Sequence, residues 1–389
     1  MTDTTPSERS ENRADHLISF ELPAKVEFGP GRLGVLERVI EESEFERAAF
    51  VMSPGRRRSG AFDSIFSHLE VRGVEVLVFD RAEKNPTLRS VARCARSLQR
   101  FGPHVVVGIG GGSSLDTAKA AAACIANRTE NALDLLDEVK TKRRAVPTIL
   151  IPTTAGTGTE VNYWSVITDQ ESREKLSIGT PKMAPYMAII DPSLALSSPP
   201  DVTLWSGVDA LTHAVEAFIS TSGNWLSDMF CLGAVSLVTE WLEHAIVQGD
   251  DLSARGGLAL ASLLAGAAMQ NVGLGLVHAM SHQISGFYDA PHGQTNALLL
   301  PHVLAFNEPA CEVKISTLDG LMKEAGTLRA WLDWILQSYG AGYESIRMRD
   351  ADVQEMAARA ASNVNAQTNP RRATEEEITA IYRSAFEVS

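Results

Sequence analysis

The sequence predicts an α/β domain built on a parallel, doubly wound sheet in the first half of the chain and an all-helical domain in the second half. Two observations predict the sheet. Segments typical of strands alternate with segments typical of helices, and the strands are uniformly apolar, as expected for strands buried on both faces. A third observation predicts the helical domain, because long helical patterns without convincing strands follow residue 200.

The elements of the first half can be placed in order along the chain. The segment 48–52 is a buried strand that runs into the turn Ser53-Pro54-Gly55, and 74–79 is a second strand. Apolar residues at helical spacing predict an amphipathic helix at 88–100. A third strand at 104–109 leads directly into glycines, and an alanine-rich helix follows at 117–127. Two further strands are expected at 148–151 and 187–190.

Helical patterns dominate the second half, with helices expected at 211–220, 228–245, 254–269 and 352–362. The prolines of Ser197-Ser198-Pro199-Pro200 interrupt regular structure, so we place the domain boundary there. The polar N-terminal segment has no apolar core and therefore predicts a flexible tail, not a signal peptide. The expected division is a tail at 1–18, an α/β domain at 19–197 and a helical domain at 198–389.

Composition indicates a soluble globular protein, since 44% of the 389 residues are hydrophobic and 21% are charged. A net charge of −13 disfavours nucleic acid and anionic membranes as partners. We find no uninterrupted apolar run of about 18 residues, so no membrane span is expected. No two cysteines are close in sequence, which favours free thiols and a cytoplasmic location; they are Cys94, Cys124, Cys231 and Cys311.

Two polar loops follow predicted strands. The first is Gly110-Gly111-Gly112-Ser113, at the start of a helix, where glycines and free N–H groups allow a phosphate to approach the backbone. It matches neither GxGxxG nor the Walker A pattern, and a tight turn without a ligand remains an alternative. The second is Pro152-Thr153-Thr154-Ala155-Gly156-Thr157-Gly158-Thr159-Glu160, whose hydroxyls suit ribose and phosphate oxygens. Together the loops predict a ligand site at one sheet edge.

Histidines and a carboxylate recur at helical spacing in the second half. Asp209 and His213 are four residues apart, as are His278 and His282, and His292 follows shortly after. The segment 278–282 is not HExxH, because Ala279 occupies the glutamate position, so a metalloprotease is excluded. One Asp with two or three His is a nitrogen and oxygen ligand set that suits Fe(II) or Zn(II). The alternative is that these are hydrogen-bonded core histidines.

The combination of these motifs resembles the iron-containing (group III) alcohol dehydrogenases. The resemblance covers roughly Phe20 to Phe386, with the motifs in the same order and spacing. It rests on the two loops with Asp116 and Lys119, on Asp209, His213 and Glu216, and on His278, His282, His292 and Gly293. Further matches are Asn85-Pro86-Thr87, Asp191-Pro192, Leu300-Pro301-His302-Val303 and Asn369-Pro370-Arg371.

The resemblance implies a dinucleotide-binding α/β domain, a helical metal-binding domain and hydride transfer between a nicotinamide and a small alcohol or aldehyde. It implies Fe²⁺, or Zn²⁺, held by Asp209, His213, His278 and His292. His282 becomes the nearby histidine that transfers a proton. It also implies a homodimer. The cofactor contacts that it implies are Ser53, Asn85, Gly111, Gly112, Ser113, Asp116, Thr153, Thr154, Thr157 and Lys175.

Three departures from the family pattern carry further expectations. Ser53 stands where many members have an Asp at the end of the first strand, and Arg56-Arg57-Arg58 follow closely. Loss of a carboxylate and gain of guanidiniums favour a 2′-phosphate, so NADP(H) is expected over NAD(H). Tyr163 and Trp164 are bulky and either shape a substrate pocket or simply pack. The segment after Asn307 looks shorter than is usual for the family.

Two other enzyme classes share related folds. Metal-independent maleylacetate reductases are one alternative, although retention of Asp209 and the three histidines disfavours them. Sugar-phosphate cyclases, which share the dehydroquinate synthase-like architecture, are lyases that recycle NAD and need basic residues for phosphate. The helical half has no obvious basic substrate cluster, which disfavours a cyclase.

Overall fold

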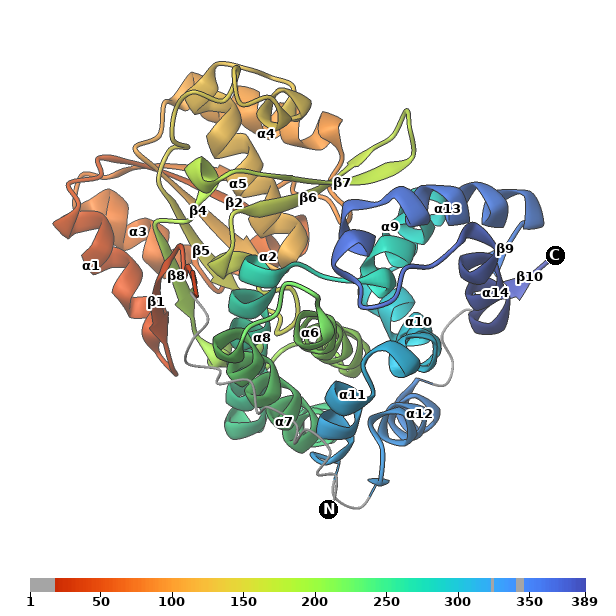
Figure 1. Ribbon diagram of the computed structural model, residues 1–389. Coiled ribbons are helices and arrows are strands. Elements are labelled where there is room, and N and C mark those ends of the chain that lie inside the picture. The colour runs from red at the N-terminus through yellow and green to blue at the C-terminus, as the bar shows by residue number, and fades with distance from the viewer. Residues whose placement is uncertain (1–17, 323–324, 341–345) are drawn as a thin grey trace, which may run out of the picture.

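A six-stranded parallel sheet forms the centre of the first half of the molecule (Figure 1). The computed structural model describes residues 18–322, 325–340 and 346–389, so the expected tail at 1–18 lies outside the described residues except for its last position. The strand order β1-β8-β5-β4-β2-β3 confirms the predicted doubly wound α/β class. The strands are β1 (Lys25–Phe28), β2 (Arg47–Met52), β3 (Glu75–Phe79), β4 (Val105–Gly110), β5 (Thr148–Pro152) and β8 (Met187–Ile190).

Helices cover both faces of this sheet because successive strand residues point to opposite sides. Phe50 packs in one apolar cluster with α1 (Val35–Glu42) and α3 (Asp63–Val71). Its neighbours Ala49 and Val51 pack in another, with α4 (Leu88–Phe101) and α5 (Gly112–Asn127). A short helix, α2 (Pro54–Arg58), directly follows β2.

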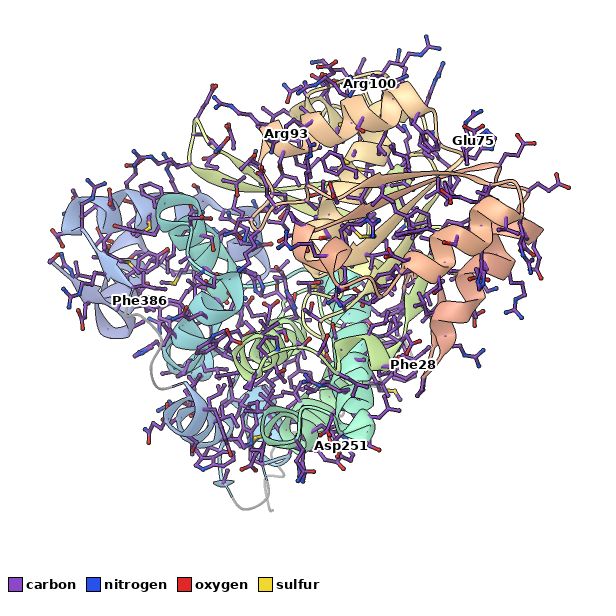
Figure 2. All side chains as sticks on the ribbon, turned by 180° about the vertical axis from the view of Figure 1, so that it is seen from behind. Phe28, Glu75, Arg93, Arg100, Asp251 and Phe386 are labelled. Carbon is purple, nitrogen blue, oxygen red and sulfur yellow. The ribbon has the colours of Figure 1, made fainter. Side chains whose placement is uncertain are left out.

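The amphipathic pattern expected at 88–100 is present in α4. Val91 and Leu98 are buried beneath the helix, whereas Arg93 and Arg100 are exposed. Figure 2 shows these two arginines on the outer surface of the molecule. Thr87 begins the helix, because its hydroxyl accepts from the Ser90 backbone N–H in a capping box.

An antiparallel hairpin, β6 (Trp164–Asp169) and β7 (Glu174–Gly179), extends from the α/β half and was not expected from the sequence. The edge strand β1 was also missed. These strands mix polar and apolar residues, so they lack the continuous apolar signal of the central strands. The hairpin matters for the site, because β7 contributes Lys175.

Long helices build the second half around a single large apolar cluster. The helix expected at 211–220 starts earlier, at Pro200, because proline is well tolerated in the first helical turn. The helices are α6 (Pro200–Ile219), α7 (Trp225–Val247), α8 (Leu252–Val272), α9 (Leu276–Tyr288), α10 (His292–Asn307), α11 (Glu312–Asp319), α12 (Leu328–Tyr339), α13 (Asp350–Ser362) and α14 (Glu375–Ala385).

This half is not wholly free of strands, which corrects the sequence-based expectation. β9 (Arg347–Met348) and β10 (Glu387–Val388) pair in parallel near the C-terminus. Each has two residues, which is too short to produce a periodic signal in the sequence.

Two helices of the described residues, α7 and α8, are long and apolar enough to cross a bilayer by length and composition alone. Both contribute residues to the apolar cluster of the helical half. Since core helices of soluble proteins pass the same test, this is weak evidence for a membrane span.

Candidate active site

Most of the residues expected to contact a cofactor lie at one edge of the six-stranded sheet. The strands β5, β4, β2 and β3 are adjacent and parallel, so the loops that follow them emerge at the same edge. Gly111 caps α5 after β4, and Ser53 caps α2 after β2. Thr153, Thr154 and Thr157 lie in the loop that follows β5.

The glycine loop and the threonine loop lie against each other. A Cβ added to Gly112 would come within 2.6 Å of the Thr157 side chain, so only glycine fits there. A Cβ on Gly111 would lie 3.3 Å from Thr154 Oγ1. The N-terminus of α5 and the threonine hydroxyls therefore form one surface, which suits the phosphate and ribose oxygens of a dinucleotide.

Arg56 connects the end of β2 to this surface. Ser53 Oγ accepts from the Arg56 backbone N–H at 3.3 Å. The Arg56 guanidinium donates to Thr153 Oγ1 at 2.9 Å, whereas that of Arg57 turns away to pair with Asp63. Of these two arginines, Arg56 is the one placed beside the threonine loop.

Asp116 supports the threonine loop from within the protein. Its side chain is only 7% exposed, and its oxygens accept from Thr159 Oγ1 at 2.5 Å and from the Val166 N–H at 3.1 Å. The fully buried Lys119 ammonium lies 3.7 Å from Asp116 and donates to Thr159 O at 2.8 Å. These contacts hold α5, the loop and the hairpin together.

Asn85 and Lys175 lie between the two halves of the molecule. The Asn85 amide donates to Asp289 Oδ1 at the end of α9 at 2.7 Å, and Lys175 Nζ lies 3.5 Å from Asn85 Oδ1. Both Asn85 and Asp289 adopt positive φ angles, 46° and 52°. Burial lowers the pKa of Lys175 to about 8, against the opposing effects of nearby carboxylates.

Four side chains from three helices converge in the helical half. Asp209 and His213 come from α6, His278 from α9 and His292 from the start of α10. One nitrogen or oxygen of each lies within 4.8 Å of those of the other three. Asp209 Oδ1 is 3.9 Å from His213 Nε2 and 3.7 Å from His292 Nε2. We call this set the four-donor cluster.

The Nδ1 atom of each cluster histidine has a partner outside the cluster. His278 Nδ1 lies 2.6 Å from Glu216 Oε2, and since a carboxylate only accepts, this nitrogen carries the proton. His213 Nδ1 lies 3.2 Å from the Gly156 carbonyl oxygen, which also only accepts. His292 Nδ1 lies 3.1 Å from Ser281 Oγ. Both His213 and His278 therefore present an unprotonated Nε2, the form that binds a metal.

Burial favours the neutral form of His213, His282 and His292 by lowering their pKa values. Burial lowers the pKa of His213, although the Asp209 carboxylate opposes the shift. Burial and then the Lys175 cation lower the pKa of His292 and of His282 well below the usual histidine value. His282 is 3% exposed, and its ring centroid lies 5.4 Å from that of His292. It is therefore neutral near pH 7 and adjacent to the cluster.

The donor set fits a divalent ion. One carboxylate oxygen and three imidazole nitrogens match the ligands that iron(II) and zinc(II) accept. The donors are largely buried, and the partners of Nδ1 orient the imidazoles of His213 and His278, as partners of ligand histidines do in metal sites.

Sequence reasoning assigned no role to several residues that contact the cluster. Glu216 belongs to the family motif of Asp209, His213 and Glu216. Its position seven residues after Asp209 places it on the same face of α6. That spacing was an available signal. Gly156, Ser281 and Asn296 gave none, because their contacts arise only when the helices pack.

A parallel sheet with polar loops along one edge, together with a buried cluster of nitrogen and oxygen donors, is an arrangement typical of oxidoreductases that use a dinucleotide and a metal ion. Models of two family domains match the chain, the iron-containing alcohol dehydrogenase domain at residues 23–192 and the C-terminal domain of the same family at residues 203–386. The chain belongs to the iron-containing alcohol dehydrogenase family, and it is an oxidoreductase of the alcohol dehydrogenase type.

Known proteins agree with this assignment over nearly the whole chain. A 1,3-propanediol dehydrogenase of Klebsiella pneumoniae is 36% identical, with 95% of this chain and 99% of the relative covered. An NAD-dependent methanol dehydrogenase of Bacillus methanolicus is 32% identical, with coverage of 95% and 100%. The crystal structure of a 1,3-propanediol oxidoreductase superimposes with a TM-score of 0.87 at 33% identity, again covering 95% and 100%.

Proposed function

We propose that the protein interconverts small alcohols and aldehydes with a nicotinamide cofactor at the sheet edge and a divalent iron or zinc ion in the four-donor cluster. The observation that carries the proposal is the convergence of four donor atoms within 4.8 Å of one another. The names of the relatives support small alcohols as the substrate class, since these proteins act on 1,3-propanediol and methanol.

When bound, the ion would supply Lewis-acid chemistry at the alcohol or carbonyl oxygen, and the nicotinamide would supply the hydride chemistry. The chain itself places these groups. Asp209, His213, His278 and His292 would hold the ion, and the first three of these residues are buried. The dinucleotide would be held by Gly111, Gly112, Ser113, Thr153, Thr154 and Thr157. Ser53 would lie at one end of it, and Asn85 and Lys175 at the other. Asp116 acts on the cofactor through the threonine loop that it supports.

His282 is assigned proton transfer between the reacting oxygen and solvent. Its neutral imidazole can accept the alcohol proton, and it lies beside the cluster. We expect His282→Ala to lower kcat by about a hundredfold or more, as loss of a general base does, while bound metal is unchanged. Steady-state kinetics with metal analysis of the same sample tests this. Loss of metal in proportion to activity would instead make His282 a ligand.

NADP(H) is the expected cofactor because Arg56 lies beside the threonine loop and Ser53 carries no charge. We expect a higher kcat/KM with NADPH than with NADH. Introducing a carboxylate by Ser53→Asp should lower kcat/KM for NADPH by about tenfold or more, since about 1.4 kcal/mol of repulsion suffices. Arg57→Ala is the matched control and should leave the preference unchanged, because that guanidinium pairs with Asp63. A wild-type preference for NADH would contradict the proposal.

Two rival activities make different predictions. A metal-independent maleylacetate reductase would keep full activity after chelation. A sugar-phosphate cyclase would turn over without net consumption of cofactor. We favour the alcohol dehydrogenase activity because the four donors are retained and both domain models match this family. By analogy with the family, we also propose a cytoplasmic homodimer divided near residue 197, with the α/β domain at 19–197 and the helical domain at 198–389.

A further inference from the structure

The Asn296 carboxamide lies inside the four-donor cluster. Asn296 follows His292 by one turn of α10, so both side chains project from the same face of the helix. The residue is completely buried. Its Nδ2 atom lies 2.7 Å from Asp209 Oδ1 and 3.2 Å from both His278 Nε2 and His292 Nε2. This one nitrogen therefore contacts three of the four donor groups.

The chemistry of these neighbours determines how the amide is oriented. Asp209 is an acceptor, and the Nε2 of His278 is an acceptor because its Nδ1 proton is directed to Glu216. An amide nitrogen only donates, so it suits this position, whereas the amide oxygen would face the Asp209 carboxylate with like polarity.

The amide oxygen shows that this orientation is held by the cluster. Asn296 Oδ1 is buried and has no hydrogen-bond partner. Burying a carbonyl oxygen without a hydrogen-bond partner costs free energy. The contacts of the amide nitrogen must offset that cost. The shortest of these contacts is the bond to Asp209.

We propose that Asn296 is a positioning residue that orients the Asp209 carboxylate for metal binding. The proposal rests on the proposed metal centre. An ion takes the lone pair of each imidazole Nε2, so the amide cannot keep these as acceptors. A carboxylate has further lone pairs, and the bond from Asn296 to Asp209 is therefore the contact that a loaded site can retain. By holding Asp209, Asn296 reduces the reorganisation that metal binding requires.

The test compares metal affinity in two variants that lack the donor. Asn296→Ala leaves a cavity, whereas Asn296→Leu largely fills it, so a shared defect reports the lost donor and not the lost volume. We expect both variants to bind Zn²⁺ about tenfold to hundredfold more weakly than wild type, as measured by competition with a chromogenic chelator on metal-depleted protein. Circular dichroism establishes that each variant is folded, and Asn296→Leu decides the test if the two variants differ, because it largely retains the volume.

Asn307→Ala is the matched control. Asn307 is a buried amide on the same helix, but it exchanges hydrogen bonds with Asn369, 62 residues away in sequence. Its loss should lower the melting temperature and leave Zn²⁺ affinity within about twofold of wild type. Unchanged or tighter Zn²⁺ binding by folded Asn296 variants would overturn the inference. Failure of wild-type protein to bind Zn²⁺ or Fe²⁺ would overturn the proposed metal centre itself, so the two failures are distinguishable.

Discussion

Replacing His278 with alanine should remove bound metal and reduce turnover by about a thousandfold or more. Polarisation of a reacting oxygen by a metal is worth several kcal/mol, and each 1.4 kcal/mol or so is a factor of ten in rate. His278 is 1% exposed and belongs to the four-donor cluster, and its ring stacks on that of His213 with the centroids 4.6 Å apart.

Elemental analysis and kinetics on the same preparation measure this effect. His302→Ala is the matched control, because His302 lies on α10 but contacts Ser384 and not the cluster. The control should retain metal and activity. A His278→Ala protein with full metal content and normal turnover would contradict the ligand assignment and the proposed chemistry with it.

The second large effect is expected for Glu216→Gln, which changes a single buried atom from acceptor to donor. Glu216 accepts from the Val277 N–H and from His278 Nδ1, both at 2.6 Å. A glutamine can still accept from Val277, but its amide nitrogen then faces His278 Nδ1. The proton of His278 must move to Nε2, which directs an N–H group into the cluster. We expect metal affinity to fall about tenfold to hundredfold, with a parallel loss of turnover.

Nitrogen NMR of the metal-free protein identifies which imidazole nitrogen of His278 carries the proton, and chelator competition gives the affinity. Glu243→Gln is a suitable control, because this residue on α7 accepts from the Tyr339 hydroxyl, away from the four-donor cluster. A Glu216→Gln protein in which His278 keeps its proton on Nδ1 and binds metal normally would refute the proposed role of the carboxylate.

Local patterns in the chain were sufficient to predict the architecture. The strand at 104–109 and the amphipathic helix at 88–100 can be recognised from the sequence, because their buried residues form regular apolar patterns within a few neighbouring positions. The hairpin containing β7 was missed because its strands mix polar and apolar residues and lack a continuous apolar run. The terminal strands β9 and β10 were missed because each has only two residues.

The residue types of the site were likewise evident from the chain, since the spacing of Asp209 and His213 and the shared family motifs indicated candidate ligands. Which atoms meet was decided by the packing of α6, α9 and α10. Asn296 and Asp209 are 87 residues apart in sequence, and Glu216 and His278 are 62 apart. Helical periodicity reaches only a few residues, so it cannot place such partners. Tertiary contacts therefore determine which nitrogen of His278 carries the proton and which groups surround the Asp209 carboxylate, because a hydrogen bond requires two atoms about 3 Å apart.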